Sequence, residues 1–132
     1  LRAVRCAVDM IEAVRTLNEG RSLDGVAIGV GINAGAAIVG AMGSEDRMDF
    51  TAIGDTVNLG ARLCSNAGRW QVLVSNEVRE KVGDRKDLSF TPLDPLTVKG
   101  KAQPVPVFAV EATSEVRSVP PKSAPPKPSA RA

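Results

Sequence analysis

The chain has 132 residues, of which 43% are apolar and 24% are charged, values that suit one soluble globular domain and exclude collagen, coiled-coil and wholly disordered classes. The formal net charge is only +2, and few aromatic residues accompany the basic ones, so we expect no nucleic-acid-binding surface. No run of about 18 apolar residues could span a bilayer, and the first residues lack the pattern of a signal peptide, so we expect a cytoplasmic protein without a membrane segment.

Apolar residues recur at helical spacing from Leu1 to Leu17 and predict a helix that ends at Asn18-Glu19-Gly20. Because no cap residue precedes this helix and the chain has no initiator Met, we expect that the sequence is a fragment whose natural protein continues upstream. Two cysteines, Cys6 and Cys64, lie in helical patterns without CxxC spacing, and the chain contains no histidine. We expect both to be reduced thiols in the core.

Bulky residues alternate with alanine and glycine from Val26 to Ile32, which predicts a strand with one bulky face and one nearly bare face. Such a bare face would let a helix, another backbone or a ligand come close. The sequence Asn33-Ala34-Gly35 has turn chemistry, and 36–42 has the pattern of a second short strand, so we expect the two strands to form a hairpin. A polar loop would follow at 43–46.

The stretch Arg47 to Ile53 is predicted to be a strand that stops at Gly54. Asp55 offers a carboxylate as N-cap for a helix from Thr56 to Ser65.

Shorter elements are predicted after this helix. They are a buried strand at 71–74, a helix at 76–82 capped by Ser75, and strands with proline-marked breaks at 88–90, 96–98 and 105–110. This mixture predicts an α+β sandwich over residues 1–112, in which helices cover an antiparallel or mixed sheet. Residues 113–132 are rich in Pro, Ala and Lys and have too little apolar surface to fold, so we expect a disordered tail.

The segment Asp49 to Leu63 carries the most chemical information, because a predicted strand passes through a Gly-Asp turn into a helix that holds Asn58 and Arg62. Residues four apart lie on one face of a helix. A guanidinium and an amide on the first turns could clamp a phosphate and a sugar, and the helix polarity favours an anion there. An alternative stays equally open, in which Arg62 is a solubilising surface residue and Asn58 only packs near the helix start.

Three stretches together resemble class III adenylate and guanylate cyclase domains in order and spacing: GVGINAGAAIVGAMGS at 29–44, RMDFTAIGDTVNLGARL at 47–63 and VKGKAQPVPVFAV at 98–110. The resemblance implies an N-terminally truncated ferredoxin-like domain of the nucleotidyl cyclase type. It implies a head-to-tail dimer with a second cyclase domain, and ATP at the interface. It also implies two metal ions, Mg²⁺ or Mn²⁺, that promote attack of the ribose 3′-hydroxyl on the α-phosphate.

The resemblance assigns roles to four residues that contact the sugar and the phosphates. Asn58 would orient the ribose, and Arg62 would stabilise the charge that develops at the α-phosphate. Lys99 matches the family lysine that neutralises the terminal phosphates, although a solvated loop lysine remains the alternative. Arg47 is expected to reach the triphosphate from the loop before the strand.

The family reads the base partly at the position seven residues before the clamp asparagine, which is Thr51 here. A threonine at this position resembles a bacterial subgroup of adenylate cyclases. Its hydroxyl could both accept and donate hydrogen bonds at the adenine edge. The backbone of Ala52 would add a contact to the same edge. A β-branched residue is also common in strands without any such role.

The two metal-binding aspartates of the family lie upstream of the helix that opens this chain. None of the aspartates that could replace them matches the family positions: Asp24, Asp46, Asp49, Asp55 and Asp94. We therefore predict no metal site in this chain and no turnover by the chain alone.

The leading hypothesis is thus a fragment of an adenylate cyclase that makes cyclic AMP for intracellular signalling. The alternative is a catalytically silent cyclase-homology module that binds nucleotide or a partner cyclase to regulate it. A further hypothesis, compatible with both, is that the Pro- and Lys-containing tail docks an SH3-like domain.

Overall fold

The computed structural model describes residues 1–20 and 25–113. Asp24 and all of the predicted tail after Thr113 lie outside these ranges. The described residues form three helices and six strands: α1 (Arg2–Glu19), β1 (Val30–Ile32), β2 (Ile38–Ser44), β3 (Arg47–Ile53), α2 (Asp55–Asn66), β4 (Val72–Ser75), α3 (Asn76–Val82), β5 (Leu88–Leu96) and β6 (Val105–Ala112). Within the described ranges, no helix is long and apolar enough to cross a membrane.

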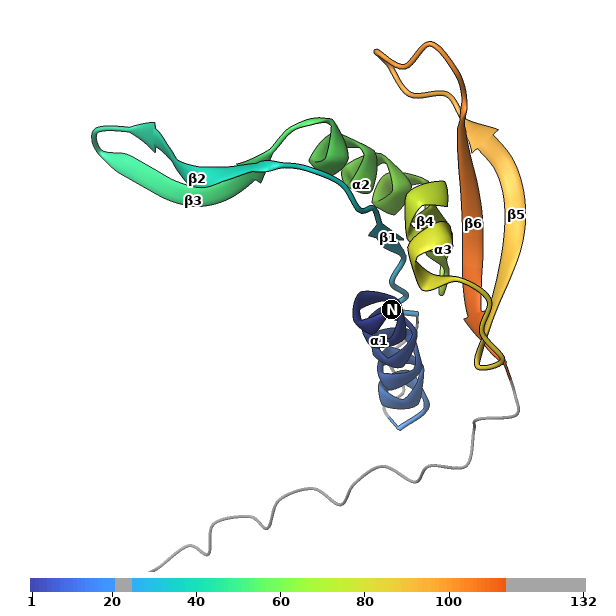
Figure 1. Ribbon diagram of the computed structural model, residues 1–132. Coiled ribbons are helices and arrows are strands. Elements are labelled where there is room, and N and C mark those ends of the chain that lie inside the picture. The colour runs from blue at the N-terminus through green and yellow to red at the C-terminus, as the bar shows by residue number, and fades with distance from the viewer. Residues whose placement is uncertain (21–24, 114–132) are drawn as a thin grey trace, which may run out of the picture.

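Four of the strands form one mixed sheet in the order β1-β4-β6-β5, in which only β1 and β4 run parallel. One core cluster joins α1 and α3 to one face of this sheet, and a second joins α2 to the other face. β2 and β3 form a separate two-stranded sheet that projects from the body (Figure 1). The predicted α+β sandwich with a mixed sheet is therefore confirmed.

The predicted apolar stripe of α1 faces the sheet. Its central residues Val4, Ala7 and Ile11 are buried in the core. The two ends of the stripe lie outside the core, since Leu1 and Leu17 are 40% and 56% exposed.

Helix α2 covers the bare face of β1. The sequence had predicted that a helix, another backbone or a ligand would come close to this face. A Cβ atom on Gly31 would lie 2.2 Å from the backbone nitrogen of Cys64, and one on Gly29 would lie 2.9 Å from the Cβ of Ala67. The opposite, bulky face packs into the core cluster with α1 through Ile28, Val30 and Ile32. Glycine at position 31 therefore sets how closely helix and strand approach.

The predicted hairpin between the first two strands is wrong. β1 is shorter than expected, at Val30–Ile32, and pairs in parallel with β4. β2 instead pairs with β3 in an antiparallel ladder that runs from Ile38↔Ile53 to Ser44↔Arg47. Alternation of bulky and small residues identifies strands, but it does not identify the strands with which they pair. Asn33, which was expected in the hairpin turn, instead forms a hydrogen bond to α2.

The sequence predicted Asp55 as the N-cap of α2, and this prediction is wrong. The N-cap is Gly54, and no side chain of the described residues caps this helix end. Asp55 is the first helical residue, where its carboxylate still interacts favourably with the positive end of the helix dipole. The predicted cap of α3 is confirmed, because Ser75 Oγ accepts a hydrogen bond from the Val78 amide at 3.4 Å.

The predicted breaks at proline are also wrong, because β5 runs as one strand from Leu88 to Leu96 through Pro92 and Pro95. It pairs on one side with β6, with a register irregularity between Leu93 and Leu96. Proline is tolerated here because β5 is an edge strand, where one side of the backbone needs no ladder partner.

The two cysteines are not core residues. Both side chains are exposed, and neither is in a disulfide. The neighbouring residue takes the core position in α2, where Leu63 is fully buried and Cys64 follows it around the helix. On the sheet face of α1, Ala7 is buried beside Cys6 in the same way.

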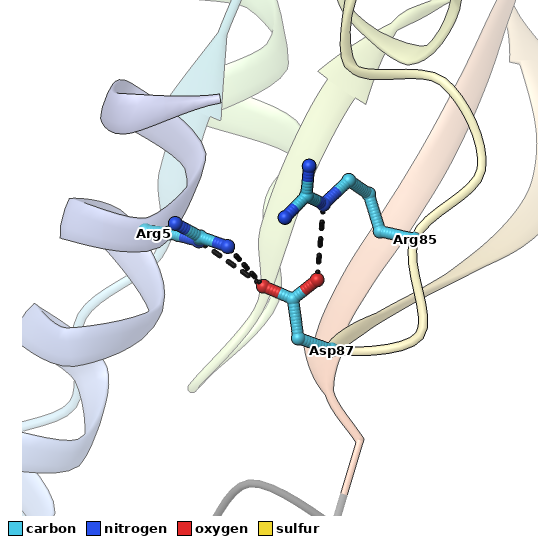
Figure 2. Close-up of polar contacts among 3 residues, drawn as sticks. All are labelled: Arg5, Arg85 and Asp87. Atoms are coloured by element: carbon cyan, nitrogen blue, oxygen red, sulfur yellow. Dashed lines mark hydrogen bonds and ion pairs between the residues drawn. The ribbon is translucent and has the colours of Figure 1, made fainter.

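A pair of arginines holds Asp87 just before β5 (Figure 2). Arg5 of α1 donates from Nε and Nη2 to Oδ2 at 3.1 and 2.6 Å, and Arg85 donates from Nε to Oδ1 at 3.0 Å. These bonds lower the pKa of Asp87 from 3.8 to about 2, with the bond from Arg5 as the largest cause. The cluster therefore ties the first helix to the far edge strand of the sheet.

Asp87→Asn is expected to lower the melting temperature by a few degrees at neutral pH, because the neutral amide accepts more weakly from both guanidinium groups. Since the folded pKa lies below the unfolded one, the ionised carboxylate stabilises the fold above about pH 4 and loses this effect as the pH falls towards 2. The difference in melting temperature between wild type and variant should shrink over that interval. A difference that stays constant down to pH 2 would contradict this role.

Candidate active site

The candidate site is built around the junction of β3 and α2. Gly54 links them with φ 129° and ψ 175°, a conformation that only glycine adopts readily. Its carbonyl accepts hydrogen bonds from the amides of Val57 and Asn58 at 3.1 and 3.0 Å. A sharp turn of this kind places the first turns of α2 directly after β3.

The two predicted clamp residues lie on the exposed side of α2. Leu59 and Leu63 take the core face of the helix, at 4% and 0% exposure. Asn58 and Arg62, each one position before a core leucine, are therefore exposed and share one helical face. Within the described residues neither side chain is held by a hydrogen bond or ion pair, so both are available to a ligand.

Two further residues fix the start of α2, and the sequence reasoning did not identify them. Asn33 Nδ2 donates to the carbonyl of Thr56 at 2.9 Å, and Thr56 Oγ1 donates to the carbonyl of Ala36 at 2.6 Å. These bonds join the end of β1 and the start of β2 to the helix that carries the clamp. The only signal was an asparagine followed by Ala-Gly, which is equally typical of an ordinary turn.

Thr51 and Ala52 lie on β3, a few residues before the clamp helix. Thr51 pairs with Gly40 and Ala52 with Val39, so the two side chains point to opposite faces of the hairpin. Thr51 is exposed and Ala52 is partly buried. The hydroxyl of Thr51 is thus accessible on one face of the hairpin, at its end nearer to α2.

Arg47 and Lys99 are not gathered around the clamp within this chain. Arg47 opens β3 at the turn of the projecting hairpin, where it pairs with Ser44 (Figure 1). Lys99 lies in the connection between β5 and β6 and is exposed. The six predicted site residues therefore lie in three places: the junction of β3 and α2, the hairpin turn, and the connection between β5 and β6. Within the described part of the chain, no side-chain hydrogen bond or ion pair joins any two of them.

The hairpin of β2 and β3 has large apolar side chains exposed on both of its faces. On the face of Thr51 these are Ile38 and Ile53, at 66% and 46% exposure. On the other face the most exposed side chains are Val39, Met48 and Phe50, at 58%, 58% and 79%. An isolated two-stranded sheet is marginally stable, and contiguous exposed apolar surface marks an interaction site.

Possible metal-binding side chains are dispersed in the described residues. No group of three or more carboxylate, histidine or cysteine side chains comes together in residues 1–20 and 25–113. The aspartates near the candidate site are dispersed, with Asp46 in the hairpin turn, Asp49 in β3 and Asp55 at the start of α2.

Residues 1–112 match the family model described as adenylate and guanylate cyclase catalytic domain. The chain is 35% identical over 114 residues to the terminal-differentiation-specific adenylate cyclase of Dictyostelium discoideum, with 83% of this chain and 5% of the relative covered. It is 32% identical over 114 residues to adenylate cyclase 1 of Rhizobium meliloti strain 1021, and this match covers 82% of this chain and 17% of the relative. The chain thus spans a small part of these curated relatives.

Solved cyclase structures share the fold. The guanylyl cyclase Cya2 gives a TM-score of 0.69 at 32% identity, with 88% of this chain and 60% of that chain covered. The adenylyl cyclase CyaB from P. aeruginosa gives a TM-score of 0.68 at 26% identity, with 86% of this chain and 58% of that chain covered. They confirm the predicted nucleotidyl cyclase type of the α+β fold. Because one is a guanylyl and the other an adenylyl cyclase, the likeness does not identify the base.

Proposed function

The chain belongs to the family of adenylate and guanylate cyclase catalytic domains, and on this premise we propose that it is the nucleotide-clamping part of an adenylate cyclase, which converts ATP to 3′,5′-cyclic AMP and pyrophosphate. The observation that carries the proposal is the exposed pair Asn58 and Arg62, four residues apart on α2 and directly after the Gly54 junction. Adenylate cyclases among the relatives support the assignment.

Arg62 acts on the reacting phosphate. As the 3′-hydroxyl oxygen bonds to the α-phosphorus and the bond to the leaving pyrophosphate breaks, negative charge grows on the phosphate oxygens. A guanidinium presents a planar fork of N–H donors to such oxygens. Arg62 is exposed on α2, so its guanidinium is free to contact a bound phosphate and to stabilise this charge electrostatically.

Asn58 acts on the sugar, and the remaining residues act on the base and the outer phosphates. The Asn58 amide can donate to and accept from ribose oxygens one helical turn before Arg62. Thr51 reads the adenine edge through its hydroxyl, with the Ala52 backbone beside it. Lys99 and Arg47 neutralise the terminal phosphates, although both lie away from α2 in this chain.

A second cyclase domain completes the site in a head-to-tail dimer. The support is that the site residues occupy separate places in one chain, and that more than half of the surface of Ile38, Met48 and Phe50 on the β2–β3 hairpin is exposed. A partner domain that covers the hairpin would bury this apolar surface, which is a favourable term in association.

The chain is proposed to depend on carboxylates outside it for Mg²⁺ or Mn²⁺. No group of three or more carboxylate, histidine or cysteine side chains comes together in the described residues, so no step is assigned to a metal bound by this chain. In cyclic phosphate formation such ions supply charge neutralisation at the phosphates.

The proposal is tested by comparing this chain with an extended protein, in which the chain is produced together with the part of the catalytic domain that the solved relatives have and this chain lacks. The extended protein is expected to form cyclic AMP from ATP with Mg²⁺ or Mn²⁺ and little cyclic GMP from GTP, while the 132-residue chain alone forms neither. Product analysis by chromatography distinguishes the nucleotides.

Turnover by the isolated chain would contradict the missing-metal-site prediction. Cyclic GMP as the main product would contradict the assignment of Thr51 to adenine. An extended protein that binds ATP without forming any product would favour the regulatory module instead.

A further inference from the structure

The distance between β1 and α2 differs along the strand. Alternate residues face α2, beginning with Gly29 before the strand. At Gly31 the two backbones touch, because a Cβ atom there would lie 2.2 Å from the nitrogen of Cys64. Asn33, the next residue on this face, has a full side chain, and its Cβ atom lies 3.8 Å from the place where a Cβ atom on Gly60 would be. The second half of α2 thus rests directly on the strand, whereas the Asn33 side chain lies between the strand and the first half.

The amide of Asn33 also holds the first turn of α2 by a hydrogen bond. Its Nδ2 donates to the carbonyl oxygen of Thr56 at 2.9 Å, in a part-buried place. Thr56 Oγ1 in turn donates to the carbonyl oxygen of Ala36 at 2.6 Å. Since Thr56 is the second residue of α2, both bonds tie the start of the helix to the segment between β1 and β2.

The stability of the fold does not account for an asparagine at this position. Asn33 Oδ1 is buried and accepts no hydrogen bond in the described part of the chain. Leaving a buried acceptor without a donor costs at least as much free energy as one hydrogen bond of the Nδ2 kind contributes. An apolar side chain would therefore be as stable here, and polar groups kept against stability mark positions that serve function. The bond to α2 is the feature of Asn33 that function can use.

We propose that Asn33 is a positioning residue that acts through Asn58: by holding the first turn of α2 it sets where the Asn58 amide, and so the ribose, lies. This role rests on the proposed function, because it takes Asn58 as the residue that orients the sugar. The Asn33 side chain contacts α2 from the strand side, whereas Asn58 is exposed on the helix, so Asn33 acts without touching the nucleotide. When its bond is lost, α2 can tilt about its contact with Gly31, and the first turns, which lie farthest from that contact, move most.

The test is Asn33→Leu in the extended protein, with Asn18→Leu as matched control. Leucine has the branching of asparagine but neither donates nor accepts a hydrogen bond. Asn18 Nδ2 donates to the carbonyl oxygen of Val26 at 2.7 Å, a bond of the same kind that involves α1 instead of α2. Asn33→Leu is expected to lower kcat for cyclic AMP formation about 10- to 100-fold, because a small misplacement of the ribose spoils the attack of its 3′-hydroxyl. Its melting temperature should stay within a few degrees of the wild type, and Asn18→Leu should keep the wild-type kcat.

A double-mutant cycle shows whether Asn33 acts through Asn58. In an Asn58→Ala protein the loss of kcat from Asn33→Leu should be clearly smaller than in the wild type, because the group that Asn33 positions is already absent. In a Lys99→Ala protein the loss should be undiminished, since Lys99 lies in the connection between β5 and β6. Equal losses in both backgrounds would assign the effect to the fold in general and overturn the proposal. Thr56→Val, which keeps the shape of threonine but cannot donate to Ala36, should show the same pattern and serves if Asn33→Leu does not fold.

Amide hydrogen exchange separates this role from the cyclase function. Asn33→Leu should speed exchange at the Val57 and Asn58 amides, which bond to the Gly54 carbonyl, at least about 10-fold and leave exchange in β4 unchanged. If the wild type forms cyclic AMP and Asn33→Leu keeps its kcat, the positioning role is wrong and the cyclase function stands. If the wild type binds ATP without turnover, faster exchange together with a raised Kd for ATP in Asn33→Leu supports the hold on Asn58, while the cyclase function is wrong. Unchanged exchange overturns the positioning role in either case.

Discussion

Arg62→Ala is expected to lower kcat of the extended protein about 100- to 1,000-fold while changing the Kd for ATP much less. The reason is that its strongest contact forms with charge that appears only as the 3′-oxygen attacks and pyrophosphate leaves, so its removal affects the transition state more than the bound substrate. Steady-state kinetics combined with ATP binding by equilibrium dialysis separates the two effects.

The loss of activity in Arg62→Ala should not result from unfolding. Arg62 is exposed, and alanine favours helices, so the variant should melt at or above the wild-type temperature. Arg62→Lys keeps the charge without the planar fork and should recover only part of the rate. Arg2→Ala, at an exposed arginine on the helix that covers the other sheet face, is the matched control and should be fully active. Equal losses in binding and turnover would contradict a transition-state role.

Gly31→Ala is expected to destabilise the chain by about 3 kcal/mol, a large part of the stability of a small domain. The added Cβ would meet backbone atoms of α2, 2.2 Å from the nitrogen of Cys64 and 2.7 Å from the carbonyl carbon of Leu63. Backbone atoms cannot move aside as a flexible side chain can, so α2 as a whole must shift. Urea unfolding followed by circular dichroism measures the loss.

The control for this prediction is Gly40→Ala, the same substitution at a strand glycine with no described atom within 4 Å of the new Cβ. It should keep the unfolding midpoint or raise it, because alanine restricts the unfolded chain. A shift of α2 in Gly31→Ala would also displace Asn58 and Arg62, so the extended variant should lose activity even where it still folds. Equal stability of the two alanine variants would show that α2 does not pack on β1 as described.

The sequence alone determined features that depend on neighbours along the chain. The helical stripe of α1, the Ser75 cap of α3 and the small-residue face of β1 follow from local periodicity and local hydrogen bonding, and the structure confirms them. The family followed from the order and spacing of short motifs, which the matching family model confirms. For the clamp, sequence spacing placed Asn58 and Arg62 on one helical face, and that face is exposed.

The tertiary structure decided everything that depends on residues distant in sequence. Alternation in 26–42 identified strands without showing that β1 would pair with Val72–Ser75 and leave β2 to β3. It left open which element would cover the glycine face. The helical pattern also placed Cys64 in the core, whereas the side chain is exposed. Each of these outcomes depends on which arrangement of buried contacts has the lowest free energy, and that free energy depends on the whole chain.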